Sequence, residues 1–132
     1  EWNCRDGERQ GVGRHWDDDG RLRWVTRYKD GKGVSEKTYF KNGNMKNEIN
    51  YSDGSGLLDG LWRQYYENGQ LEAEVKYKEG KKHGLWKQYY INGQLGAEGN
   101  WKNGEQDGLW IAWYENGQLM YRKNWKNGKL LQ

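Results

Sequence analysis

The chain contains no proline and a single cysteine in its 132 residues. Proline removes a backbone N–H, so its absence suits strands that must donate every hydrogen bond of a β-ladder. One cysteine excludes an internal disulfide framework and permits a reducing compartment. No stretch approaches 18 consecutive apolar residues and no segment has the pattern of an amphipathic helix. The sequence therefore predicts no transmembrane segment.

Aliphatic side chains are also scarce, since Leu, Ile, Val and Phe make up only 19 of the 132 residues. So low a share is typical of disorder when the net charge is large. Here the formal net charge is +3, and nine Trp with ten Tyr replace the aliphatic core. Each of these aromatic side chains can bury about 150–250 Å². Basic residues are interspersed and form no run, so we do not expect nucleic acid as a partner.

The chain does have a repeat with a period of 24 residues. The sequence Gly-Leu-Trp-x-x-Tyr-Tyr-x-Asn-Gly-Gln-Leu begins at Gly60, returns at Gly84, and returns at Gly108 with Trp113 in the first tyrosine position. Looser copies precede these three, which is the signature of a repeat array. We expect one repeat domain over 1–132, with a partial unit at 1–10 and units at 11–34, 35–59, 60–83, 84–107 and 108–132.

Turn signals divide each unit into a hairpin. Asn-Gly pairs favour two-residue hairpin turns, because both residues tolerate positive φ. The chain has six of them, at Asn42, Asn68, Asn92, Asn103, Asn116 and Asn127, and four related pairs: Asp19-Gly20, Asp30-Gly31, Asp53-Gly54 and Glu79-Gly80. The sequence therefore predicts an all-β fold, a repeat array of antiparallel β-hairpins that forms an elongated, twisted single-layer meander.

A two-residue turn fixes which residues face each other across a hairpin. On one face it pairs large side chains with small ones, as when Trp86 covers Gly99 or Ala112 faces Tyr121. The predicted partners on this face are Trp62 with Val75, Gln64 with Ala73, Tyr66 with Leu71, Gln88 with Ala97, and Tyr90 with Leu95.

The other face combines charge with aromatic side chains. The same register places Arg63 opposite Glu74, Lys87 opposite Glu98 and Lys37 opposite Glu48, as expected of exposed cross-strand ion pairs. Five aromatic residues fall in one column on this face: Trp16, Tyr39, Tyr65, Tyr89 and Trp113. This aromatic column is either a binding stripe, since aromatics flanked by charge are typical of protein interfaces, or a shield that packs on its neighbours. The column, with Arg63 and Lys87, is the candidate partner-binding site.

No catalytic constellation accompanies this face. His15 and His83 lie in unrelated positions of their units, and neither has a recurring acidic or nucleophilic partner. Cys4 aligns with Trp101 and Tyr77, which indicates a small core residue and not a nucleophile. We therefore expect a protein that is not an enzyme, with no metal site and no cofactor.

The unit Gly-Leu-Trp-x-x-Tyr-Tyr-x-Asn-Gly-Gln-Leu-x-x-Glu-x-x-Tyr-Lys-x-Gly, from Gly60 to Gly80, resembles the bacterial variant of the MORN repeat found in YwqK-type antitoxin components. The resemblance extends from about Gly11 to Lys129, and the unit between Val34 and Asp59 departs from it by lacking the Gly-Leu-Trp opening. It implies a curved single-layer array of hairpins and a protein that binds and neutralises a partner toxin. It assigns no individual residues.

Three functions remain open. The first is a non-enzymatic protein-binding module, an antitoxin or immunity protein whose partner is a cognate protein toxin. The second is a MORN-type scaffold or membrane-associated array, in which basic connectors such as Lys81-Lys82 would meet anionic lipid. The third is a cell-wall glycan-binding repeat, because choline-binding repeats share Tyr-Tyr-x-x-Asn-Gly, although their repeat is shorter. The first favours a cytoplasmic location and leaves a periplasmic or surface location open; unpaired terminal strands would also permit edge-to-edge self-association.

Overall fold

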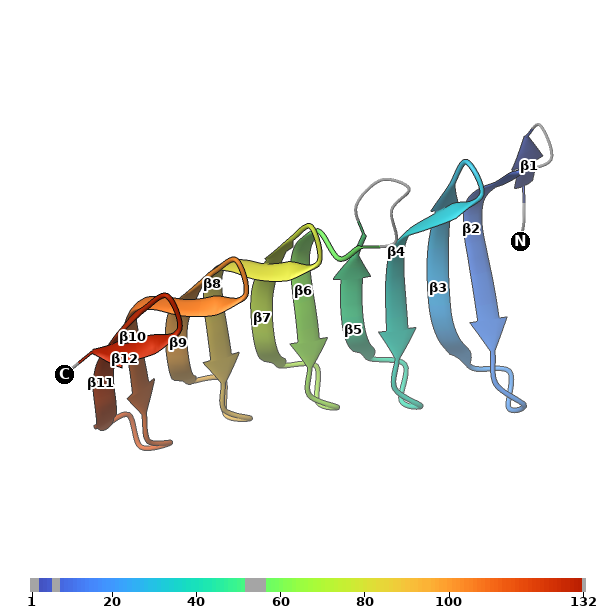
Figure 1. Ribbon diagram of the computed structural model, residues 1–132. Helices are drawn as coiled ribbons and strands as arrows, with labels where there is room; N and C mark the ends of the chain where they lie inside the picture. The colour runs from blue at the N-terminus through green and yellow to red at the C-terminus, as the bar shows by residue number, and fades with distance from the viewer. Residues whose placement is uncertain (1–2, 6–7, 52–56, 132) are drawn as a thin grey trace.

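The computed structural model describes residues 3–5, 8–51 and 57–131. Within this part of the chain, twelve strands form a single sheet in which each strand pairs with its neighbours in sequence order. All of the pairings are antiparallel. Figure 1 shows the hairpins standing side by side, with the two ends of the chain at opposite ends of the array. The predicted all-β meander of hairpins is confirmed.

Five hairpins make up most of the array, namely β2–β3, β4–β5, β6–β7, β8–β9 and β10–β11. The strands are β1 (Asn3–Arg5), β2 (Glu8–Trp16), β3 (Leu22–Lys29), β4 (Lys32–Tyr39), β5 (Met45–Asn50), β6 (Gly60–Tyr65), β7 (Leu71–Lys78), β8 (Lys81–Tyr89), β9 (Leu95–Lys102), β10 (Glu105–Trp113), β11 (Leu119–Lys126) and β12 (Lys129–Leu131). We call the loop inside a hairpin a tip loop, and the turn between successive hairpins a linking turn.

The linking turns are the two-residue turns that the sequence predicts. Both central residues have positive φ, as at Asn103 and Gly104 with 51° and 85°. This is the type I′ geometry, whose twist matches that of the flanking strands. The same pattern holds at Asp30-Gly31, Glu79-Gly80 and Asn127-Gly128. The predicted turn at Asp53-Gly54 lies outside the described residues.

The tip loops are longer, and for them the prediction of two-residue turns is wrong. The Gly69 N–H donates to the Tyr66 carbonyl oxygen at 3.0 Å, and the Tyr66 N–H donates to the Gln70 carbonyl oxygen at 2.8 Å. The Asn68 Oδ1 accepts the Gln70 N–H at 2.9 Å, so the asparagine satisfies a turn donor without adopting positive φ. The loops at Asn42, Asn92 and Asn116 repeat this bond. The loop at Asp19-Gly20 has the same two backbone bonds.

A β-bulge beside each tip loop shifts the pairing by one residue. Gln64 pairs with Ala73 and Tyr65 pairs with Leu71, so Glu72 has no partner across the hairpin. The predicted pairings of Tyr66 with Leu71 and of Tyr90 with Leu95 are therefore wrong, because Tyr65 and Tyr89 take those positions. The rest of the predicted register is confirmed: Trp62 with Val75, Gln64 with Ala73, Trp86 with Gly99, Gln88 with Ala97, and Ala112 with Tyr121.

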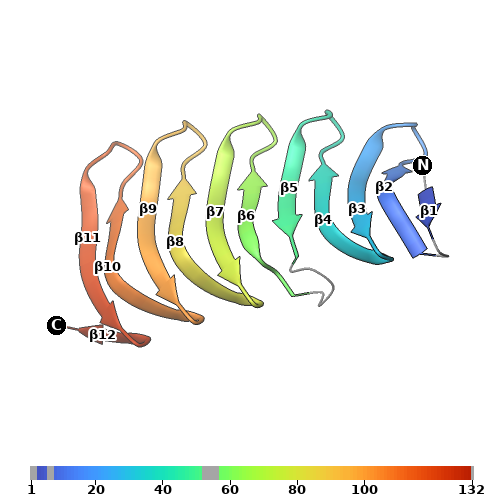
Figure 2. The ribbon, with the colours of Figure 1, turned by 90° about the horizontal axis from the view of Figure 1, so that it is seen from above.

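Glycines with positive φ bend the strands near the linking turns. Gly60, Gly84 and Gly108 have φ of 83°, 110° and 79°, a region that costs glycine little because it has no Cβ. Beyond these glycines the strand ends fold over as short ribbons, at the top in Figure 1 and towards the viewer in Figure 2. Successive ribbons are joined by backbone hydrogen bonds, as from the Gly104 N–H to the Lys82 carbonyl oxygen at 2.8 Å. From Leu58 to Gly128 the ribbons are thus joined along one edge of the array.

Trp62, Trp86 and Trp110 lie on one face of the sheet, which we call the inner face. The Trp110 ring stacks on Trp86 at 5.1 Å between centroids and meets the edge of Trp101 at 5.4 Å, and its Nε1 donates to the Asn100 carbonyl oxygen at 3.0 Å. Among the described residues the buried hydrophobic side chains are Val75, Trp110 and Ala112, at 1%, 5% and 5% exposure. The core is thus a thin line of contacts between neighbouring hairpins, as expected of a one-layer repeat.

Tyrosine hydroxyls bridge neighbouring hairpins at their tips. The Tyr66 Oη donates to the Tyr89 carbonyl oxygen at 2.7 Å, and the Tyr90 Oη donates to the Trp113 carbonyl oxygen at 2.7 Å. Strand pairing between these hairpins stops before the tips, for example at Ala73 with Gln88. The hydroxyls therefore satisfy carbonyl groups that the ladder no longer reaches.

Replacing Tyr90 with Phe should lower the free energy of unfolding by about 0.5–1.5 kcal/mol, because it removes this bond and keeps the ring. Urea denaturation measures the change. Tyr114 occupies the same position of the last unit and is half exposed, so Tyr114→Phe is the matched control and should leave stability unchanged. An equal loss in both variants would show that the bridge is not what stabilises the tips.

Candidate protein-binding face

The face opposite Trp62, Trp86 and Trp110, which we call the outer face, carries a ladder of alternating charge. Successive strands β4 to β9 each contribute one residue, in the order Lys37, Glu48, Arg63, Glu74, Lys87 and Glu98. The three predicted pairings are therefore confirmed as register, and each continues into the next hairpin. Each of the four residues between the ends of the ladder, from Glu48 to Lys87, pairs with an oppositely charged residue on both neighbouring strands.

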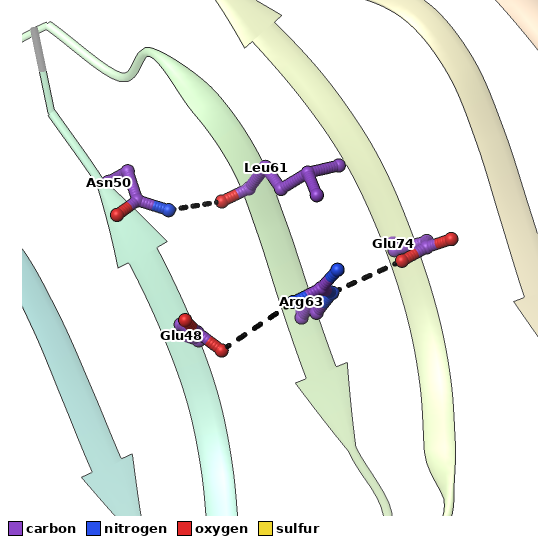
Figure 3. A network of polar contacts seen from close by, with 5 residues as sticks. All are labelled: Glu48, Asn50, Leu61, Arg63 and Glu74. Atoms are coloured by element: carbon purple, nitrogen blue, oxygen red, sulfur yellow. Dashed lines mark hydrogen bonds and ion pairs between the residues drawn. The ribbon is translucent and has the colours of Figure 1, made fainter.

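Arg63 is the centre of this ladder (Figure 3). Its Nε lies 3.2 Å from the Glu74 Oε2, and its Nη1 lies 3.9 Å from the Glu48 Oε2. The hydrogen bond to Glu74 raises the pKa of Arg63 above its ordinary value. In the part of the chain that the structure describes, Lys37 and Lys87 make no ion pair within 4.0 Å of their facing glutamates. Such half-exposed ion pairs contribute about 0–1 kcal/mol each to the free energy of unfolding. The ladder therefore does more to fix the strand register than to stabilise the fold.

The aromatic column lies on the outer face beside the tip loops, and the structure places all five residues at the end of alternate strands. Trp16 is 55% exposed. Tyr39, Tyr65, Tyr89 and Trp113 are half-buried. Each pairs with an aliphatic side chain on the second strand of its hairpin, namely Leu22, Met45, Leu71, Leu95 and Leu119. The column is thus one half of a continuous apolar row.

A second apolar row was missed by the sequence reasoning. Leu61, Leu85 and Leu109 lie on the outer face on the other side of the charge ladder, and they are 38%, 50% and 40% exposed. Their signal was present in the Gly-Leu-Trp motif, because alternation puts the leucine on the face opposite its tryptophan. Arg63 and Lys87, the two predicted basic residues of the site, lie between this row and the aromatic column.

A depression of about 340 Å³ lies on the outer face of the first two hairpins. Val12 and Val25 provide apolar lining. The charged residues of the lining are the basic Arg14, Arg27 and Lys37 and the acidic Glu48. This end of the face is therefore more basic than the centre of the ladder. No sequence motif predicts the depression, since its residues come from four strands that only the meander brings together.

The two histidines make contacts of a structural kind. The His15 ring stacks on Trp24 at 4.5 Å, and the His83 Nδ1 accepts the Asn103 N–H at 3.3 Å. Asp17 accepts the backbone N–H groups of Arg21 and Asp19 in its tip loop, and the bond from Arg21 lowers the pKa of this carboxyl. No cluster of three or more potential metal ligands occurs among the residues described. Nor does any helix there have the length and apolarity to cross a bilayer.

The outer face therefore presents two apolar rows with a charge ladder between them, repeated every two strands. Paired strands are about 4.8 Å apart, so equivalent side chains recur about every 10 Å along the array. Apolar anchors next to charged groups that fix register are the composition of protein-binding surfaces.

Four segments of the chain, residues 32–53, 58–79, 82–103 and 106–132, match the family model described as MORN repeat variant. No curated protein matches the sequence. Among solved structures, the chain is similar to one from Streptococcus pneumoniae described as accessory secretory protein 1, 2 and 3, with a TM-score of 0.46 and 10% identity. That match covers 83% of this chain and 19% of the other, so the chain spans less than a fifth of the length of that protein.

Proposed function

The chain belongs to the MORN repeat variant family, and from this premise we propose that it is a non-enzymatic module that binds a partner protein through its outer face. The observation that supports this proposal is that exposed or half-exposed apolar side chains recur beside a charge ladder in successive units. Tyrosine side chains that are already half-buried, and an arginine that Glu74 already holds, lose less conformational freedom on binding than fully exposed side chains do. The partner is proposed to lie along the array and to contact several units at once.

The aromatic column is the part of the face whose loss should matter most. Replacing Tyr65, Tyr89 and Trp113 with Ser removes three successive anchors and should weaken binding of the partner at least about 100-fold. The partner is first isolated by affinity capture from the source cells and then purified, so that its dissociation constant can be measured directly. Circular dichroism and the thermal midpoint report whether the triple variant keeps its fold.

A matched control uses three lysines that recur in one position beside the linking turns. Lys78, Lys102 and Lys126 are exposed and lie far along their strands from the aromatic column. Their triple replacement with Ser should leave the affinity for the partner unchanged. A folded aromatic-column variant that binds as tightly as the unmodified chain would refute the proposed interface.

The narrower proposal is that the partner is a protein toxin, as the resemblance to YwqK-type antitoxin components implies. Expression of the captured partner alone should then arrest growth, and co-expression of the chain should restore it. The aromatic-column variant should fail to restore growth while the lysine variant succeeds. A partner that is harmless when expressed alone would leave a binding module without an antitoxin role.

A second candidate is a membrane-associated scaffold, and the edge formed by the linking turns is the observation that favours it. Lysines pair across these turns, as Lys78 with Lys81 and Lys126 with Lys129. Clustered lysines attract anionic lipid headgroups. Under this alternative the lysine variant, and not the aromatic-column variant, would lose binding to vesicles that contain phosphatidylserine.

A further inference from the structure

A pocket on the inner face lies between hairpins β8–β9 and β10–β11, and its volume is about 340 Å³. Aromatic residues line it from three hairpins: Tyr66, Trp86, Tyr89, Tyr90 and Tyr121. Small residues complete much of the remaining lining: Gly96, Ala97 and Ala112. The pocket therefore combines several ring surfaces with space between them.

The space arises where the chain departs from its own repeat. Gly96 stands where the preceding unit has Glu72, and Ala112 stands where it has Gln88. Both changes remove side-chain atoms from the same part of the inner face. A Cβ at position 96 would lie 3.0 Å from the Tyr90 ring, so glycine is what lets this ring lie against the strand. The pocket is thus a specific feature of these two units and not a property of every repeat.

Lysine ammonium groups already lie over ring faces in this chain, one of them over Tyr121, which lines the pocket. The Nζ atoms of Lys46, Lys82 and Lys123 lie 5.7, 4.7 and 4.6 Å from the centroids of Phe40, Trp101 and Tyr121. An ammonium above an aromatic ring is attracted by the negative potential of the ring face. In the described part of the chain, no such group lies over Tyr66, Trp86 or Tyr90.

Two carboxylates act on Tyr66, which lines the pocket. Burial raises the pKa of the Tyr66 phenol, and the carboxylates of Glu72 and Glu115 raise it further. The hydroxyl itself donates to the Tyr89 carbonyl oxygen, so it is not available as a donor to a ligand. Negative charge close to an aromatic pocket favours cations over neutral or anionic groups.

We propose that this pocket is a binding site for the ammonium group of a lysine side chain carried by a polypeptide, in its unmodified or its methylated form. The rings would enclose the apolar stem and the charged head, while Glu72 and Glu115 balance the charge. The site lies on the inner face and shares only Tyr89 with the aromatic column. It therefore goes beyond the proposed function, and the variants that test it change no residue of the column.

Three small probes test the ligand chemistry by calorimetric titration of the full chain. They are Nα-acetyl-lysine methylamide, its Nε-trimethyl form, and Nα-acetyl-norleucine methylamide, which keeps an apolar stem and lacks the ammonium. At least one cationic probe should bind about fivefold or more tightly than the norleucine probe. The stronger of the two cationic probes identifies the form of lysine that the site takes. Equal binding of the norleucine probe, or no binding of any probe at about 50 mM, would overturn the proposal.

Charge variants separate the pocket's chemistry from its shape. Replacing Glu72 and Glu115 together with Gln should weaken binding of the cationic probe at least about threefold, more so at low salt, and leave the norleucine probe unaffected. Glu105→Gln, at a linking turn, is the matched control and should change neither. Ala112→Gln restores the residue of the preceding unit and should fill the pocket and abolish binding. If Ala112→Gln does not fold, the variant with both Glu72 and Glu115 replaced by Gln still tests the proposal. An unchanged affinity of that variant for the cationic probe would contradict the proposed site.

Discussion

Replacing Trp110 with Ala should lower the free energy of unfolding by about 3–5 kcal/mol, the range for truncation of a large buried aromatic side chain. Trp110 is 5% exposed and contacts two rings of the neighbouring hairpin β8–β9, Trp86 at 5.1 Å and Trp101 at 5.4 Å. Its loss also leaves the Asn100 carbonyl oxygen without the Nε1 donor. Urea denaturation gives the free energy, and hydrogen exchange should show protection lost first in β8 to β11, because repeats are coupled only to their neighbours.

The matched control for this variant is Trp16→Ala. Trp16 is the same residue type but is 55% exposed on the outer face, so its truncation should cost less than about 1 kcal/mol. Comparable losses at Trp16 and Trp110 would contradict the assignment of the packed face.

Gly99→Ala should cost nearly as much as removing the tryptophan. A Cβ at Gly99 would lie 2.1 Å from the Trp110 ring, and the nearest atoms belong to the rigid bicyclic part of that ring. The Trp110 ring must therefore move away from Gly99. This movement breaks the same ring contacts that Trp110→Ala removes. In the double variant the two losses should fall well short of additive, since both remove one set of contacts. Additive losses would show that Gly99 and Trp110 stabilise the array independently.

The sequence could predict the register inside each hairpin because alternation and size compensation are local. Trp62 with Val75 and Ala112 with Tyr121 follow from counting outward from the turn, and the structure confirms both. Counting failed only within one residue of the tip loops. There the Asn68 side chain accepts the Gln70 N–H and a bulge absorbs Glu72, which pair spacing alone does not reveal.

Contacts between hairpins were beyond the sequence, because they depend on curvature. The register correctly places Trp86 opposite Gly99, yet the ring found nearest to the glycine belongs to Trp110 of the next hairpin. For the same reason the sequence could place the aromatic column on the outer face but could not decide between a binding stripe and a packed shield; Tyr65 and Tyr89 are half-buried. The exposed leucine row was accessible to the same alternation rule, because each leucine directly precedes a tryptophan of the inner face.

Replacement with Ala and with Asn should rank oppositely in cost at Gly108 and at Gly99, because glycine is needed at these two positions for different physical reasons. Gly108 has a φ of 79° and nothing within 4 Å of the place where a Cβ would lie, whereas Gly99 has no room and is absent from the residues of positive φ. At Gly108 the cost is backbone strain, about 1–2 kcal/mol for Ala and less for Asn, which tolerates the left-handed region. At Gly99 the cost is steric, so the larger Asn should be worse than Ala. The free energies of unfolding of the four variants test this reversal: Asn should cost less than Ala at Gly108 and more than Ala at Gly99. The same order at both positions would show that one mechanism governs both glycines.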